Sequence, residues 1–159
     1  MLEDNKNCFC CSNIAFEYCC KPILTEVKKA ANSEALMRSR FTAYVLKDYA
    51  YILDTYAKKP RQNLSIQELA QSAENTQWLS LQVIGHSANL VTSQVEFKAF
   101  YKIGECFYVL HELSDFVLED EKWHYSKGNL FKNSGEFKPQ RNSQCLCGSG
   151  KKYKKCCGK

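Results

Sequence analysis

The sequence predicts an α+β fold, with helices in the first half of the chain, an antiparallel sheet in the second half, and a small four-cysteine metal site at each end. Three observations predict this organisation. Apolar residues recur with helical spacing over residues 33–57, they alternate with strand spacing over residues 78–128, and one cysteine spacing occurs twice. Helices followed by a run of strands are typical of α+β folds. The 159 residues, 45% of them hydrophobic, suffice for one packed core.

The helical half begins after the first cysteine cluster. We expect a short helix over residues 24–31 and a long one over residues 33–57, with Ser33 as its N-cap. Apolar positions in the long segment keep to one helical face, and Lys58-Lys59-Pro60 ends it. Residues 65–76 form a further predicted helix.

The second half alternates apolar and polar residues, which predicts four strands over residues 78–87, 89–103, 105–120 and 121–128. Turn residues separate them, notably Gly104 and the pair Glu119-Asp120. Consecutive strands joined by such short turns form an antiparallel meander.

Eight of the ten cysteines form two clusters with the spacing C-x-C-x8-C-C. The clusters are Cys8, Cys10, Cys19, Cys20 and Cys145, Cys147, Cys156, Cys157. The N-terminal residues include acids and no apolar stretch, and no apolar run approaches the roughly 20 residues of a membrane helix. We therefore expect a cytoplasmic protein with reduced thiols, and clustered thiols in that compartment indicate metal sites rather than disulfides.

Four thiolates form a closed tetrahedral zinc site without a position for water, which indicates a structural metal. We expect two zinc ions, although iron also accepts four thiolates. Gly148 and Gly150 allow the sharp backbone turns that the spacing requires. Cys11 and Asn13 stand at the equivalent places of the first cluster, and cysteine adopts left-handed backbone much less readily than glycine.

The net charge of +5 is concentrated near the second cluster. Lys151, Lys152, Lys154 and Lys155 surround Tyr153 between the two halves of that cluster. A divalent ion held by four thiolates carries a net charge of −2, so these lysines partly neutralise the metal site. They also form a basic surface that suits an acidic protein partner or, alternatively, nucleic acid.

The segment CLCGSGKKYKKCCG resembles the SEC-C motif, the small metal-binding tail of the bacterial preprotein translocase motor SecA. The resemblance places the ligands at Cys145, Cys147, Cys156 and Cys157. It implies a docking role, notably onto the export chaperone SecB.

The stretches LMRSRFTAY, VEFKAFY, LHELSDF and WHY are similar to the YchJ family, in which SEC-C motifs flank a central domain. The resemblance implies an N-terminal motif over residues 1–22, a central domain over 23–138 and a C-terminal motif over 139–159. The central domain of that family is similar to the nuclear-transport-factor-two and cystatin-like superfamily. In such domains a curved sheet wraps the helices into a cone with a pocket.

A pocket of this kind has candidate polar residues in the sequence. Glu112 and Ser114 share one strand face, Glu96 on the preceding strand could join them, and Arg38 or Arg40 could supply the opposite charge. Tyr44 and Trp78 are candidate wall residues. A carboxylate in an apolar cone could act as a base. The sequence favours the alternative that these carboxylates are solvated or held in structural ion pairs.

The sequence therefore favours a non-enzymatic metal-binding adaptor whose knuckles dock onto a protein partner, such as a SecB-like chaperone or a ribosome-associated component. One alternative is an enzyme or small-ligand binder that uses the pocket around Glu96 and Glu112. Another is RNA or ribosome binding through the basic C-terminal knuckle.

Overall fold

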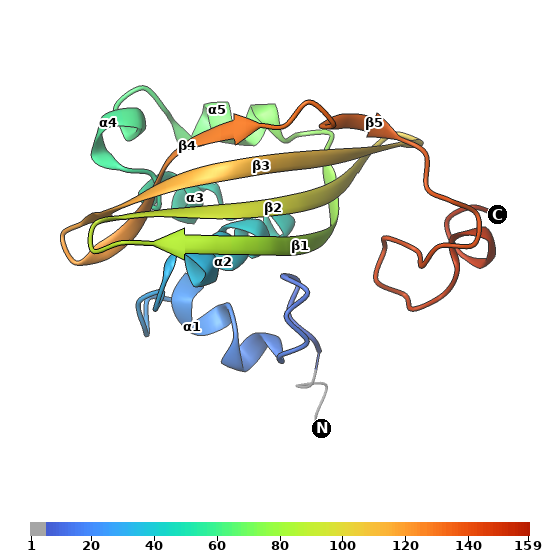
Figure 1. The fold of residues 1–159 in the computed structure, drawn as a ribbon, viewed down its shortest axis with the longest axis horizontal. Helices are drawn as coiled ribbons and strands as arrows, with labels where there is room; N and C mark the ends of the chain where they lie inside the picture. The colour runs from blue at the N-terminus through green and yellow to red at the C-terminus, as the bar shows by residue number, and fades with distance from the viewer. Residues whose placement is uncertain (1–5) are drawn as a thin grey trace.

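In the computed structural model, which describes residues 6–159, an antiparallel sheet lies against a group of helices (Figure 1). The strands follow the order β1-β2-β3-β4, and a short β5 pairs with β3. The strands are β1 (Gln77–Ala88), β2 (Thr92–Ile103), β3 (Cys106–Glu119), β4 (Lys122–Leu130) and β5 (Gly135–Phe137). The helices are α1 (Lys21–Leu24), α2 (Ser33–Leu46), α3 (Tyr49–Asp54), α4 (Lys58–Arg61) and α5 (Ile66–Ser72), with 3-10 turns η1 (Phe16–Tyr18) and η2 (Tyr153–Lys155).

The predicted α+β architecture is confirmed, and the alternation of side chains in β2 and β3 explains it. Val95, Phe97 and Phe116 point to the helix side of the sheet, where all three are buried. Leu36 and Phe41 of α2 pack against them in the main core. The register shifts within β1 and between β3 and β4 mark bulges, which bend a sheet.

The helical prediction is wrong in several places. The segment Lys58–Arg61, expected to end a helix, is the short helix α4, and the helix predicted over residues 65–76 ends at Ser72. Residues 25–31 are not helical, since α1 covers only Lys21–Leu24. The N-cap of α2 is Asn32, whose side chain accepts a hydrogen bond from Ala35 N at 2.8 Å. The long helix is broken at Lys47, where φ is 60°.

The break in the long helix has a local cause. Asp48 is a capping residue whose side chain accepts a hydrogen bond from Tyr51 N at 3.1 Å, so a new helix, α3, begins there. The break lets α3 turn back toward α2, where Ser39 Oγ lies 2.6 Å from Tyr51 Oη. Helical spacing continued across this position because both helices bury an apolar face.

The turns and the last strands also differ from the prediction. The β3–β4 turn is Asp120-Glu121, one residue later than predicted, and both residues have positive φ. Two such residues are typical of the tight turns that join hairpin strands. The strand β5 was not predicted, because three residues are too few for a periodic signal.

The edge strand β4 is covered by the segment that follows α3. Tyr125 N donates to Thr55 O at 2.7 Å, and Ala57 N donates to Tyr125 O at 2.8 Å. These bonds satisfy backbone groups that an edge strand would otherwise leave unpaired. They also bring Tyr56 and Tyr125 together, with ring centroids 5.2 Å apart.

Across residues 6–159, the helices are all too short or too polar to cross a membrane.

The side chain of Glu112 on β3 fills the space that a glycine on the neighbouring strand leaves open. A Cβ atom at Gly128 would lie 2.2 Å from Cδ of Glu112. The carboxylate is 8% exposed and accepts hydrogen bonds from Ser114 Oγ at 2.7 Å and Tyr125 Oη at 2.8 Å. The absence of a side chain at Gly128 therefore lets a buried carboxylate reach its partners.

We expect Gly128→Ala to displace this carboxylate from Ser114 and Tyr125 and to lower the free energy of unfolding by about 2 kcal/mol. Gly85→Ala on β1 is the matched control, because a Cβ atom there meets nothing within 4 Å and neither glycine has positive φ. Urea unfolding of the metal-loaded chains measures both changes. Equal stability of the two variants would contradict this account of Gly128.

Candidate metal centres

Each predicted cysteine cluster closes into a group of four sulfur atoms. In both groups every Sγ lies within 4.8 Å of the other three. In the N-terminal group, Cys19 Sγ lies 3.6 Å from Cys10 Sγ and 3.9 Å from Cys20 Sγ. Zinc at 2.3 Å from four tetrahedral sulfurs requires sulfur–sulfur separations of about 3.8 Å. The group thus has the donor chemistry and the spacing of a closed four-thiolate site.

The C-terminal group has the same geometry. Cys156 Sγ lies 3.4 Å from Cys147 Sγ and 4.0 Å from Cys157 Sγ. The backbone paths match as well: Cys145 N donates to Lys151 O at 2.8 Å, as Cys8 N donates to Ile14 O at 2.8 Å. The two clusters are therefore copies of one knuckle.

A serine holds the same place in both knuckles. Ser12 Oγ lies 3.2 Å from Cys19 Sγ, and Ser149 Oγ lies 3.3 Å from Cys156 Sγ. Each serine oxygen also accepts a backbone N–H two residues later, at 3.2 Å and 3.3 Å. Such hydrogen bonds fix the orientation of metal ligands.

The first knuckle adopts the glycine backbone without glycine. Cys11 and Asn13 have φ of 61° and 63°, and Gly148 and Gly150 have φ of 78° and 74°. A positive φ is unfavourable for cysteine. The Cys11 side chain also makes a tertiary contact, because its sulfur accepts a hydrogen bond from Leu81 N at 3.4 Å.

The thiols within a knuckle differ in acidity. A hydrogen bond from Ser149 lowers the pKa of Cys147 to about 6, so this thiol is ionised at neutral pH. Hydrogen bonding with Cys145 raises the pKa of Cys157 to about 12. Burial raises the pKa of Cys19 in the first knuckle to about 11. A bound cation would replace the remaining protons, because metal ligands are thiolates.

The N-terminal knuckle is part of the main hydrophobic core. Cys8, Cys10 and Cys20 are buried in the same cluster as the α2 and strand side chains. Thr42 Oγ1 lies 3.8 Å from Cys8 Sγ, and Arg38 Nη1 donates to Cys10 O at 2.8 Å. The helix that fills the centre of the fold therefore also packs on the first metal loop.

The C-terminal knuckle projects beyond the end of the sheet next to β5 (Figure 1). Its aromatic contact with the domain is Tyr153, whose ring lies edge-on to Phe107 at 5.7 Å. Cys147 and Cys157 are exposed and Cys145 is buried, whereas Cys8, Cys10 and Cys20 of the first knuckle are all buried.

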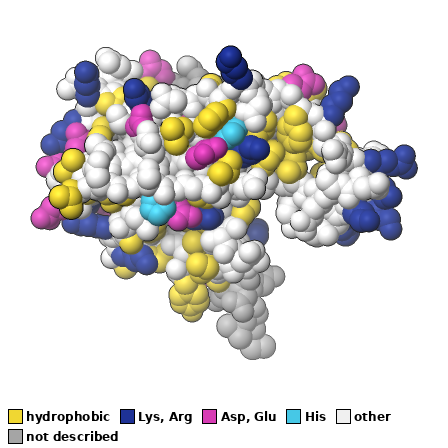
Figure 2. All heavy atoms as spheres, in the orientation of Figure 1, with side chains coloured by type: hydrophobic (Ala, Val, Ile, Leu, Met, Phe, Trp, Pro, Cys, Tyr) yellow, Lys and Arg dark blue, Asp and Glu magenta, His cyan; other side chains and the backbone are white. Residues whose placement is uncertain are grey.

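The candidate partner-binding residues separate into two groups. Lys151, Lys152 and Lys155 are exposed and Lys154 is half-buried, while Tyr153 is turned toward the domain. Lysine and arginine side chains gather on this lobe (Figure 2).

Known proteins share this arrangement. A family model described as the middle NTF2-like domain of YchJ matches residues 32–128, which is more than half of the chain. The chain belongs to the YchJ family. A SEC-C motif model matches residues 141–159 of this YchJ-family protein.

Curated relatives of this YchJ-family protein are named UPF0225 proteins. That of Pectobacterium carotovorum is 38% identical and aligns over 97% of this chain and 99% of its own length. That of Photorhabdus laumondii is 40% identical over 95% and 98% of the two chains.

Two solved structures are similar to the structure of this chain. A SEC-C motif containing protein from Rhodopseudomonas palustris has a TM-score of 0.76 and 34% identity, covering 80% of this chain and all of that one. A second, from Psychrobacter arcticus, has a TM-score of 0.71 and 28% identity, covering 99% and 98% of the two chains.

The candidate pocket residues are only partly brought together. Tyr44, Trp78 and Glu112 line a cavity on the helix side of the sheet, and Ser114 hydrogen-bonds to Glu112. Burial raises the pKa of Tyr44 to about 12, so its hydroxyl stays protonated at neutral pH.

Two pocket predictions are corrected. Glu96 pairs with Leu113 on the opposite face of the sheet, where its carboxylate lies 2.8 Å from His111 Nε2. Adjacent strands place directly opposed residues on one face, and Phe97, not Glu96, is opposite Glu112. Arg38 contacts the first metal loop, so Arg40 supplies the cation of the cavity.

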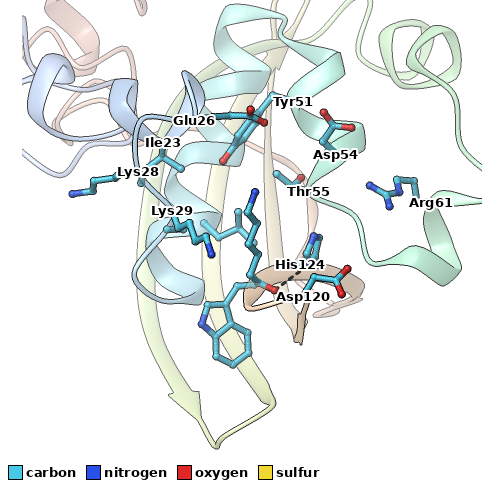
Figure 3. A pocket seen from close by; sticks show the side chains of 14 residues that line it. Ile23, Glu26, Lys28, Lys29, Tyr51, Asp54, Thr55, Arg61, Asp120 and His124 are labelled. Atoms are coloured by element: carbon cyan, nitrogen blue, oxygen red, sulfur yellow. Dashed lines mark hydrogen bonds between the residues drawn. The ribbon is translucent and has the colours of Figure 1, made fainter.

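A second cavity, of about 390 Å³, was not predicted from the sequence (Figure 3). It lies between the α1–α2 connection, α3 and the β3–β4 hairpin. Lys28, Lys29 and Arg61 line it together with Glu26 and Asp54. The charged residues that line this cavity come from three separate segments of the chain. The sequence therefore contains no pattern that could have predicted the cavity.

The two knuckles should respond differently to loss of a ligand. We expect Cys8→Ser to lower the free energy of unfolding of the central domain by on the order of 3 kcal/mol, because this site lies in the core. Cys145→Ser, the matched change in the exposed knuckle, should leave that transition nearly unchanged. Urea unfolding followed by tryptophan fluorescence measures the effect, because Trp78 and Trp123 lie in the central domain.

Metal content provides the control. Each variant should lose one of two bound ions, and equal destabilisation by both variants would contradict the assignment of the first knuckle to the core.

Proposed function

We propose that this YchJ-family protein is a non-enzymatic cytoplasmic adaptor that holds two zinc ions and docks onto an acidic protein surface through its C-terminal knuckle. The observation that carries the proposal is the difference between two copies of one knuckle. Three cysteines of the first copy are buried in the core, whereas two cysteines of the second are exposed and its surface carries lysines. If both knuckles only stabilised the fold, they would not need to differ in burial and in surface charge.

The chemistry of the exposed knuckle supports docking rather than catalysis. Four thiolates leave no open position on a tetrahedral ion, so the metal would act by holding a short segment in shape. Such a segment could not bury a core of its own. Its lysines would meet acidic side chains of a partner and would set the association rate and the choice of partner.

The resemblance to the tail of the translocase motor supports a partner from protein export, such as a SecB-like chaperone. A ribosome-associated component is the other protein partner that the sequence suggests. RNA is the second candidate, because four lysines within five residues also suit phosphates.

We expect Lys152→Glu combined with Lys155→Glu to weaken binding to the partner at least about tenfold at low salt, because attraction becomes repulsion. Lys28→Glu combined with Lys29→Glu is the control, since it changes two exposed lysines far from the knuckle in sequence and reverses the same charge. Binding of purified SecB and of purified ribosomes, measured by biolayer interferometry, gives the affinities.

The outcomes separate the candidates. Binding of SecB that only the knuckle variant loses would support docking onto a chaperone. Ribosome binding that nuclease treatment removes would identify RNA instead. Equal binding by both double variants would contradict a role of the knuckle in docking.

A further inference from the structure

The cavity on the helix side of the sheet has a volume of about 270 Å³. Its walls are mainly aromatic: Phe41, Tyr44, Tyr56, Trp78, Phe97 and Tyr125. Ser72, which is exposed, and Thr76, which is half-buried, line the part near the α5–β1 connection, so the cavity reaches solvent there. Enclosed aromatic space with a few polar groups is typical of small-molecule sites.

Two opposite charges lie in this cavity without pairing with one another. Arg40 is 3% exposed and Glu112 is 8% exposed. The ion pairs within residues 6–159 do not join them. Both contact Tyr125 instead: its hydroxyl donates to Glu112 Oε1, and its ring lies 4.2 Å from Arg40 Cζ. Buried charges that do not meet a counter-charge are costly, so their retention requires an explanation.

The carboxylate has unused capacity to accept hydrogen bonds. Ser114 and Tyr125 both donate to Oε1, and no donor within residues 6–159 reaches Oε2. Oε2 is also not fully buried. Within residues 6–159, the fully buried side-chain nitrogen or oxygen that has no hydrogen-bond partner is Trp78 Nε1. Glu112 lines the cavity and retains a free acceptor.

The guanidinium of Arg40 likewise has N–H groups that donate no hydrogen bond. Arg40 donates to Thr55 Oγ1 and Ile52 O, and both bonds leave from Nη1. Its planar group is held over the rings of Tyr56 and Tyr125, with Cζ 4.7 Å and 4.2 Å from their centroids. The remaining N–H groups of Arg40 are thus fixed in orientation and available to an acceptor.

We propose that this cavity binds a small, planar, uncharged carboxamide on an aromatic ring, whose carbonyl oxygen accepts from Arg40 and whose NH2 group donates to Glu112 Oε2. The proposal goes beyond docking, since it concerns a different part of the molecule.

Charge and size select this class of ligand. Arg40 and Glu112 together are neutral, so an anion would add an uncompensated negative charge beside a carboxylate. An amide supplies one acceptor and one donor on adjacent atoms, and an aromatic ring matches the aromatic walls. The volume is slightly below the roughly 300 to 1,000 Å³ of sites for drug-sized ligands, so the ligand is smaller than those.

The test uses the full-length, metal-loaded chain, labelled with ¹⁵N, and benzamide as the probe. The chain has two tryptophans, so two indole N–H signals report on binding. Trp78 lines the proposed site and Trp123 lines the other cavity. We expect benzamide to shift the Trp78 signal in a saturable manner and to leave the Trp123 signal in place. Benzoate has the same shape but no donor, and it should bind at least about tenfold more weakly.

Glu112→Gln tests the recognition itself. Glutamine keeps the shape of the side chain and can still accept from Ser114 and Tyr125, but it replaces the free acceptor with a donor. The affinity for benzamide should fall about tenfold and that for benzoate should rise. Glu96→Gln, on the opposite face of the sheet, should change neither affinity.

Three results would overturn the proposal. They are no shift at the solubility limit of benzamide, equal shifts of both indole signals, and a Glu112→Gln variant that keeps the preference for benzamide. The backbone amide spectrum of each variant shows whether it is folded, so a loss of binding can be separated from a loss of structure.

Discussion

The packing of the N-terminal sulfur cluster against α2 is the constraint on which much of the structure depends. Cys8 and Cys10 lie in the same core cluster as Phe41. Four thiols within 4.8 Å cannot all ionise unless a cation compensates their charge, so the state of this cluster is linked to the state of the core. The first knuckle thus acts as part of the central domain, although the sequence presents it as a separate motif.

The second knuckle has the same hydrogen bonds but a different surrounding. It lies beyond the end of the sheet, and Tyr153 packs on Phe107 there (Figure 1). An exposed knuckle can present its lysines without disturbing the core, which suits a recognition role. Duplication of one local structure therefore places one four-cysteine cluster in the core and the other beyond the end of the sheet.

The helix side of the sheet contains buried charged groups that stability alone does not favour. A carboxylate and a guanidinium are buried near one another, and a glycine at position 128 leaves room for the carboxylate. Apolar residues of similar volume are often as stable as buried charges. A sheet and helices arranged in this way provide both a rigid frame for the knuckles and a cavity with fixed polar groups.

The sequence by itself determined the helix-then-sheet order, the eight clustered cysteines and the lysines beside the second cluster, because periodicity and spacing are local properties. It also predicted that Glu112 and Ser114 share a strand face. Only the tertiary structure decided that Glu96 lies on the other face and that Arg40, rather than Arg38, lies in the cavity, since strand register and helix rotation depend on packing between distant segments. The same holds for the knuckles: identical spacing gave identical loops, but their burial depended on which surfaces the fold left for them.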